Sequence, residues 1–221
     1  MLISHSHQFI FFHVAKTGGM SARAVLEPFA EEPEKFKIKR PPRIKNGKPN
    51  KVYEMWEAIL LHAKARDAKK LLPNGIFDDY YKFAFVRNPW AWQVSMYHFI
   101  LKEPKHVKRK LVESMSGFDE YLEWVIATPN PYPKGATKLQ AEAIADADGN
   151  LLVDYVGRFE TLADDFNAVC GQLNLDVRLP HRNKSKHRDY RDYYNDHTRA
   201  LVAKHFQQDI ELFGYTFDIG S

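Results

Sequence analysis

The stretch that decides the fold is QFIFFHVAKTGGMS, which occupies residues 8–21. Residues 8–14 are apolar on both faces and rich in aromatic side chains, as expected of a strand buried inside a parallel sheet. This strand runs into a turn that contains Gly18 and Gly19, and residues 22–29 then read as a helix. The pattern predicts a strand, a glycine-rich turn and a helix.

The same order of elements recurs further along the chain. Residues 82–86 form a second apolar run, and Pro89 suits the first turn of a helix expected over 90–101. Residues 151–156 form a third apolar run before a helix expected over 162–173. This alternation predicts an α/β fold with a central parallel sheet flanked by helices. Further helices are expected over 59–72, 117–127 and 198–213.

The composition is that of an ordinary globular domain. The chain has 221 residues, of which 44% are hydrophobic and 27% charged, and its mean hydropathy is -0.49. Its one cysteine, Cys170, has the helical apolar spacing of a core residue, which excludes a disulfide framework and a cysteine-rich metal site. Residues 1–7 lack the pattern of a signal peptide, and no apolar run approaches the ~20 residues of a membrane span. We therefore expect a single cytoplasmic domain over residues 1–221.

Positive charge is concentrated in three segments, although the net charge is only +4. Residues 35–51 hold eight basic residues and no acid and are broken by prolines and a glycine, which predicts a basic, mobile insertion. Residues 102–110 add five basic residues, and residues 178–191 add six. Each run is either a solvated face or a surface for a partner with several negative charges, and charge alone does not choose between them.

The glycine-rich loop, residues 15–21, is a candidate anion site. Its glycines allow a ligand to approach closely, and the following helix offers free backbone N–H groups. Lys16 adds a positive charge, and Thr17 and Ser21 add hydroxyl donors. Because the lysine precedes the glycines, this is not the G-x-x-x-x-G-K-[ST] pattern of nucleotide kinases. The alternative is a turn without a ligand. The candidate phosphate-binding residues are Lys16, Thr17, Gly18, Gly19, Met20 and Ser21.

A second candidate anion site follows the strand expected at 82–86. Arg87 stands at the carboxyl end of this strand, and Ser95 lies about two helical turns further on. Ligands of open α/β sheets bind outside the carboxyl ends of the strands, so Lys16 and Arg87 are expected to open onto one cleft. Two such sites on neighbouring strand ends suggest a ligand with two separated anionic groups.

These motifs together resemble a known family, the sulfotransferases that use 3′-phosphoadenosine 5′-phosphosulfate (PAPS), and within it the carbohydrate O-sulfotransferase-like group with its small bacterial members. Residues 13–21 look like the loop that holds the 5′-phosphosulfate, and FVRNP at 85–89 with Ser95 and Tyr97 looks like the motif that holds the 3′-phosphate. Later segments of the group are similar to VGRFETL at 156–162, LPHRNKSKH at 179–187 and DIELFGY at 209–215. The resemblance spans nearly the whole chain in the family's order.

The resemblance implies a P-loop-like, three-layer αβα fold and transfer of a sulfuryl group from PAPS to an acceptor hydroxyl, with adenosine 3′,5′-bisphosphate as product and without a metal. Lys16 and the loop N–H groups would face the leaving phosphate. A role beside the cofactor is expected for Lys184 and Lys186. The leading acceptor is a carbohydrate, and the basic runs favour an anionic one. One position departs from the family pattern: Trp92 stands where the family usually has an arginine.

Histidine is the side chain best suited to deprotonate an acceptor hydroxyl near neutral pH. His62 lies where this family carries a histidine between its two cofactor motifs, and a helix beginning near Ala63 would put it at the first helical turn. Its alternative role is structural. His13 also borders the glycine-rich loop, but its place inside a strand favours packing. Stacking on sugar rings is a minor alternative to core packing for Trp56, Trp90, Trp92 and Trp124.

Two other functions remain open at this point. A nucleic-acid-binding protein would fit the sequence pI of about 9.0, but the chain has no helix-turn-helix, zinc-finger or RNA-recognition signature, so we expect no nucleic-acid partner. A P-loop nucleotide kinase is the other alternative, and it would show magnesium-dependent nucleotide hydrolysis. Salt-dependent binding to a random duplex would favour the first alternative, and such hydrolysis the second.

Overall fold

The structure is a computed structural model that describes residues 1–31, 62–73, 75–132, 136–180 and 188–218, with two further short strands at 44–45 and 48–49. Its centre is a sheet of four strands in the order β1-β2-β5-β6. These strands are β1 (Leu2–Ser4), β2 (Phe9–Phe12), β5 (Tyr81–Val86) and β6 (Tyr155–Arg158). Strands β2, β5 and β6 run parallel, as the three apolar runs predict.

Helices account for about half of the remaining described chain. They are α1 (Gly19–Leu26), α3 (Ala65–Leu71), α4 (Ile76–Asp79), α5 (Pro89–Lys102), α6 (Arg109–Glu113), α7 (Phe118–Ala127), α8 (Ala141–Ile144), α9 (Leu162–Gln172), α10 (Asp196–His205) and α11 (Gln207–Phe213). Short 3-10 turns are η1 (Glu27–Phe29) and η2 (Tyr190–Tyr193).

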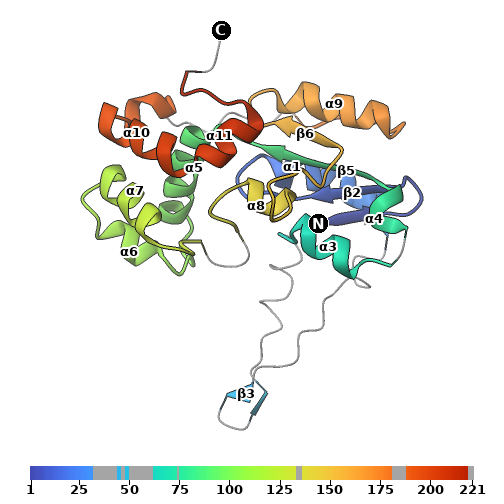
Figure 1. Cartoon of the computed structure of the whole chain (residues 1–221), viewed down its shortest axis with the longest axis horizontal. Helices are drawn as coiled ribbons and strands as arrows, with labels where there is room; N and C mark the ends of the chain where they lie inside the picture. The colour runs from blue at the N-terminus through green and yellow to red at the C-terminus, as the bar shows by residue number, and fades with distance from the viewer. Residues whose placement is uncertain are drawn as a thin grey trace.

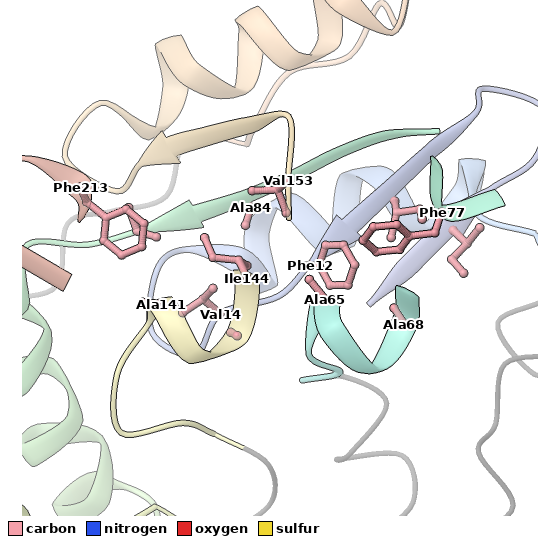
Figure 2. Packing of buried hydrophobic residues seen from close by; sticks show 14 of the residues in the cluster. Phe12, Val14, Ala65, Ala68, Phe77, Ala84, Ala141, Ile144, Val153 and Phe213 are labelled. Carbon is pink, nitrogen blue, oxygen red and sulfur yellow. The ribbon is translucent and has the colours of Figure 1, made fainter. Parts of the chain in front are cut away.

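The sheet is buried on both faces because its strands are apolar at successive positions. Phe11 and Phe83 belong to one buried cluster, which they share with α1 and α9, including Cys170. Phe12 and Ala84 point to the other face, against α3 and α8 (Figures 1 and 2). The sequence prediction of a sheet flanked by helices is confirmed, as is the core position of Cys170.

A third cluster lies beside the sheet, where α5, α6, α7 and α10 come together (Figure 1). Trp90 and Trp92 are buried in it, 4% and 1% exposed, and Trp124 packs partly buried against it. These three tryptophans therefore contribute to packing, which was the stronger of the two expectations. Trp56 lies outside the described residues.

Several boundaries differ from the prediction. Strand β1 is antiparallel to β2, with Leu2 opposite Phe11, so the sheet is not wholly parallel. The third parallel strand spans 155–158 instead of 151–156, because Leu151 forms an isolated bridge with Ala145 before the chain joins the sheet.

The helices expected at 198–213 and 59–72 also differ. Phe206 divides the C-terminal helix into α10 and α11, since its φ of -118° and ψ of 22° are not helical. Helix α3 begins only at Ala65, so His62 precedes the helix instead of standing in its first turn.

Little of the basic run at 35–51 is described. Strands β3 (Ile44–Lys45) and β4 (Lys48–Pro49) pair antiparallel, with Ile44 opposite Pro49. The rest of the predicted insertion, like Lys184 and Lys186, lies outside the described residues. Within the described chain, no helix combines the length and apolar character needed to cross a bilayer.

Candidate functional site

The glycine-rich loop connects the carboxyl end of β2 to helix α1. Lys16 has a φ of 64° and Gly18 a φ of 78°, so two residues of the loop adopt the left-handed conformation. The Thr17 hydroxyl is buried and donates to the carbonyl of Val14 at 3.0 Å, which tightens the turn. Gly18 is the N-cap of α1, and no side chain of the described residues caps this helix end. The first N–H groups of α1 are therefore available to an anion.

Both loop glycines are also required by their neighbours. A Cβ on Gly18 would lie 2.4 Å from Leu162 Cδ2, and one on Gly19 would lie 2.1 Å from His13 Cδ2. A side chain at Gly18 would displace the Leu162 side chain, and one at Gly19 would displace the His13 ring. Met20 is 56% exposed, and Ser21 is half-buried.

Lys16 and Arg87 lie close enough for their charges to interact. Burial lowers the pKa of Lys16, and the nearby charges of Arg87 and Lys102 lower it further. The Lys16 ammonium lies 4.5 Å from the centre of the Phe99 ring. The Lys16 ammonium is thus held by an aromatic face, and an anion, which attracts it more strongly, can replace this contact.

Arg87 is held through its backbone and its side chain. Its N–H donates to Gln140 Oε1 at 2.8 Å, and its carbonyl accepts from Gln140 Nε2 at 2.7 Å. The guanidinium lies 4.1 Å from the centre of the Phe159 ring. Burial lowers the pKa of Arg87 to about 10, while Glu160 and Tyr215 oppose this shift. Among the described residues, no hydrogen-bond partner reaches the buried Nε of Arg87.

Residues after Arg87 fix the start of helix α5. The Asn88 side chain caps the helix by accepting from Trp90 N at 3.0 Å, and its amide donates to the carbonyl of Thr216 at 2.7 Å. Glu160 accepts from Asn88 N at 2.9 Å and from the Tyr215 hydroxyl at 3.0 Å. The arginine turn, residues 87–89, is therefore tied to the end of β6 and to the C-terminal segment.

Ser95 lies on α5 between two residues that contact the glycine-rich loop. Trp92 donates from its indole to the carbonyl of Ala15 at 2.7 Å, and Phe99 contacts Lys16. Residues three and four positions apart share a helix face, so Ser95 lies on the face of α5 that is turned to the loop. Its side chain is half-buried.

His62 lies against His13 at the end of β2. Its Nδ1 is 3.0 Å from the carbonyl of His13, and the two ring centres are 4.9 Å apart. A carbonyl can only accept, so Nδ1 of His62 carries the proton and Nε2 keeps its lone pair. Burial lowers the pKa of His62, opposed by this hydrogen bond. The predicted place of His62 in the first turn of a helix is wrong, because α3 begins at Ala65, and the neutral form of the ring is favoured by its burial.

His13 is a packed residue, as its position in the strand predicts. It is 5% exposed, and burial together with the neighbouring His62 lowers its pKa to about 3. Its Nδ1 has no hydrogen-bond partner within the described part of the chain. His13 therefore fills the space between Gly19 and His62 without a charge.

No role for Gln140, Phe159, Glu160 or Phe99 follows from the sequence alone. Phe159 and Glu160 lie in the segment at 156–162, which is similar to a segment of the sulfotransferase family. That similarity was the one sign in the sequence that they contribute to the site. Gln140 bonds only to backbone groups of a distant segment and has no local signature.

A hollow of about 370 Å³ lies at the opposite end of the parallel strands, lined by residues that include Ser6, Gln8, Tyr81 and Asn174. It is remote from Lys16 and Arg87, which follow the carboxyl ends of β2 and β5. No cluster of three or more His, Cys, Asp or Glu side chains in the described chain is arranged to hold a metal ion.

Comparison with known proteins supplies a family. The model of the sulfotransferase family matches residues 1–216. The chain is also similar to an uncharacterized protein of Archaeoglobus fulgidus, with 28% identity over 108 residues that cover 47% of this chain and 79% of that protein.

Proposed function

The chain belongs to the sulfotransferase family and is a PAPS-dependent enzyme, and from this premise we propose that the glycine-rich loop and the arginine turn bind the two ends of PAPS while His62 accepts the proton of a carbohydrate hydroxyl. The nucleotide-kinase and nucleic-acid-binding alternatives are set aside by the family. A single P-loop-like, three-layer αβα domain over residues 1–221 is part of the same proposal.

The observation that carries the proposal is the proximity of Lys16 and Arg87 at the carboxyl ends of β2 and β5. Each charge is partly removed from water, and the charge of Arg87 disfavours the protonated form of Lys16. Two cations in such a position are stabilised by an anion that bridges them. A nucleotide with phosphate groups on both the 3′ and the 5′ carbon of its ribose meets this requirement.

The residues present fit the two ends of PAPS. The N–H groups at the start of α1 and the Ser21 hydroxyl suit the 5′-phosphosulfate, and Lys16 can reach it from Phe99. The Thr17 hydroxyl donates to the carbonyl of Val14, so Thr17 would contribute its backbone N–H instead of the hydroxyl expected from the sequence. The Nε of Arg87, which has no hydrogen-bond partner among the described residues, and the hydroxyl of Ser95 suit the 3′-phosphate. When bound, PAPS supplies the activated sulfuryl group. Lys16 and the loop N–H groups then stabilise the charge that develops on the leaving phosphate.

His62 is the proposed base. Its Nδ1–H is held by the carbonyl of His13, which leaves Nε2 as the proton acceptor. Burial keeps the ring neutral at physiological pH, because it lowers the pKa. The acceptor proton would therefore pass to Nε2 as the hydroxyl attacks sulfur.

The acceptor is proposed to be an anionic carbohydrate, because the surface beside Lys16 is basic. Lys102 is exposed at the end of α5, one turn beyond Phe99, and residues 102–110 continue with further basic side chains. This surface adjoins Lys16, whose pKa responds to the charge of Lys102. Carbohydrates that carry carboxylate or sulfate groups would be attracted to it. The basic segments at 35–51 and 178–191 are proposed to contribute in the same way, and Lys184 and Lys186 are proposed to act beside the cofactor.

The cofactor part of the proposal is tested by calorimetry with adenosine 3′,5′-bisphosphate and AMP. AMP leaves the arginine turn without a ligand, so its affinity should be about 10- to 100-fold lower, as expected for one lost charge-assisted contact. Equal affinities would contradict the two-site arrangement. A screen of neutral and anionic saccharides with labelled PAPS then identifies the acceptor class.

The base is tested with His62→Ala. General-base catalysis typically contributes 10²–10⁴-fold, so kcat should fall by about that factor while the affinity for adenosine 3′,5′-bisphosphate is retained. His5→Ala is a matched control at a half-buried histidine that bonds to Tyr80 instead. Turnover of the His62 variant within about fivefold of wild type would exclude this role.

A further inference from the structure

Trp92 connects helix α5 to the glycine-rich loop. Its side chain is 1% exposed, and its indole Nε1 donates to the carbonyl of Ala15 at 2.7 Å. The ring packs edge-on against Tyr132, with the ring centres 5.4 Å apart. Ala15 immediately precedes Lys16, so this hydrogen bond acts on the peptide group through which the chain enters the left-handed turn.

Lys16 occupies a backbone conformation that needs support. Its φ of 64° is unfavourable for a residue with a Cβ, and such conformations persist where the surrounding structure holds them. The Ala15–Lys16 peptide is planar and trans, so its N–H points opposite to its C=O. By fixing the carbonyl of Ala15, Trp92 therefore also fixes the direction of the Lys16 N–H and the place where the Lys16 side chain starts.

We propose that Trp92 is a positioning residue for sulfuryl transfer, which sets the Ala15–Lys16 peptide so that the Lys16 ammonium can follow the charge on the leaving phosphate. Phe99, seven residues later on the same face of α5, guides the end of that side chain. An indole is a neutral donor, so it anchors the loop without adding a positive charge beside Lys16 and Arg87. The inference rests on the role proposed above for Lys16.

Trp90 offers a matched control on the same helix. It is 4% exposed, and its indole also donates to a backbone carbonyl, that of Arg199 at 3.1 Å. This carbonyl belongs to α10 and not to the glycine-rich loop. Trp90→Phe and Trp92→Phe therefore remove the same kind of hydrogen bond and similar packing, but only the second change affects the loop.

The test compares kcat, the PAPS KM and the melting temperature of these two variants. Trp92→Phe should lower kcat by about 10- to 100-fold, the range expected when a catalytic group is misplaced by about 1 Å, with a smaller change in affinity for adenosine 3′,5′-bisphosphate. Trp90→Phe should lower the melting temperature about as much as Trp92→Phe does, and it should leave kcat within about threefold of wild type. Benzothienylalanine at position 92, which keeps the bicyclic shape but lacks the N–H, should reproduce the loss in kcat.

A double-mutant cycle tests the route through Lys16. In a Lys16→Ala background, Trp92→Phe should reduce kcat little further, because residues that act as a unit are not additive. Fully additive losses would overturn the proposal, as would a Trp92→Phe kcat within about threefold of wild type or equal losses for both tryptophan variants. Wild-type turnover of Lys16→Ala alone would instead contradict the role of Lys16, and the two tryptophan variants would still decide whether Trp92 positions the loop.

Discussion

The glycine-rich loop and the arginine turn follow neighbouring strands, yet they are held in different ways. The arginine turn is tied to three distant segments: the Gln140 side chain bonds to the backbone of Arg87, the Glu160 side chain accepts from the N–H of Asn88, and the backbone carbonyl of Thr216 accepts from the Asn88 side chain. The glycine-rich loop is held mainly at its entrance, by Trp92 and by its own Thr17 hydroxyl. The ammonium of Lys16, the residue after Ala15, lies over the ring of Phe99.

This difference suggests a division of labour. A cation whose backbone and ring contacts are fixed loses little further freedom when a phosphate arrives, so Arg87 is suited to binding. A lysine on a flexible stem, held by a cation–π contact of modest energy, can move with a developing charge. Arg87 is therefore expected to act in the ground state and Lys16 in the transition state.

The strongest test of this division is Lys16→Ala. Loss of one preorganised charge at a leaving group should lower kcat by about 10²–10³-fold, while the affinity for adenosine 3′,5′-bisphosphate falls less because the loop N–H groups still bind the phosphate. Single-turnover kinetics and calorimetry on the same variant measure the two quantities. An unchanged kcat with a raised PAPS KM would make Lys16 a ground-state binder and remove the contrast with Arg87.

The complementary change is Arg87→Lys, which keeps the charge but loses the planar fork and its contact with Phe159. Affinity for adenosine 3′,5′-bisphosphate should fall by about 10- to 100-fold, and affinity for AMP should stay close to wild type, because AMP has no 3′-phosphate. Competitive displacement by the two nucleotides measures this selectivity. A parallel loss for both nucleotides would show that Arg87 supports the whole site instead of one phosphate.

The two sites are alike in what the sequence predicts of them. Each follows a short apolar strand, and the local signals of glycines, lysine and arginine are enough to place Lys16 and Arg87 at neighbouring strand ends. What holds them comes from elsewhere in the chain. Gln140 and Glu160 bond to backbone groups more than 50 residues away, and such pairings leave no local pattern.

The same reason explains the errors in the fold. Strand β1 has three residues, too few for a periodic signal, and its position depends on pairing with β2. The apolar run at 151–156 reads as a strand, but Val153 is buried in a core cluster before the parallel register begins with Tyr155 opposite Phe83. Val153 is thus buried, as an apolar run predicts, but Leu151 is exposed, and neither the extent of the strand nor its hydrogen-bond register was predicted.

A smaller effect is expected from Gly19→Ala, which tests the rigidity of the glycine-rich loop. The new Cβ would lie 2.1 Å from His13 Cδ2, so the buried ring must shift. Overpacking of this kind costs about 1–3 kcal/mol, or roughly 2–10 °C in melting temperature for a chain of this size. Gly171→Ala is the control, because a Cβ there meets no atom of the described residues within 4 Å and the residue is helical. Equal melting temperatures for the two variants would mean that the loop yields easily.

The smallest effect concerns the support of the arginine turn and its dependence on pH. Asp209 is 1% exposed and accepts from the N–H groups of Gln140 and Ala141, both at 2.8 Å. It therefore positions Gln140, which in turn bonds to the backbone of Arg87. Burial raises the pKa of Asp209 from its ordinary value of 3.8 to about 7, although the two N–H donors oppose the shift.

Because the folded pKa of Asp209 lies above the unfolded one, the folded state binds the proton more tightly, and stability is lost as the pH rises from about 4 through 7. Asp209→Asn cannot ionise and so lacks this loss, although its amide accepts only one of the two N–H groups. The melting temperature of the wild type relative to Asp209→Asn should therefore fall by about 2–5 °C between pH 5 and pH 8. Scanning calorimetry of both proteins over this range measures it. A constant difference would show that the N–H groups of Gln140 and Ala141 stabilise the carboxylate enough to offset its burial, and that the arginine turn is supported equally at every pH in the range.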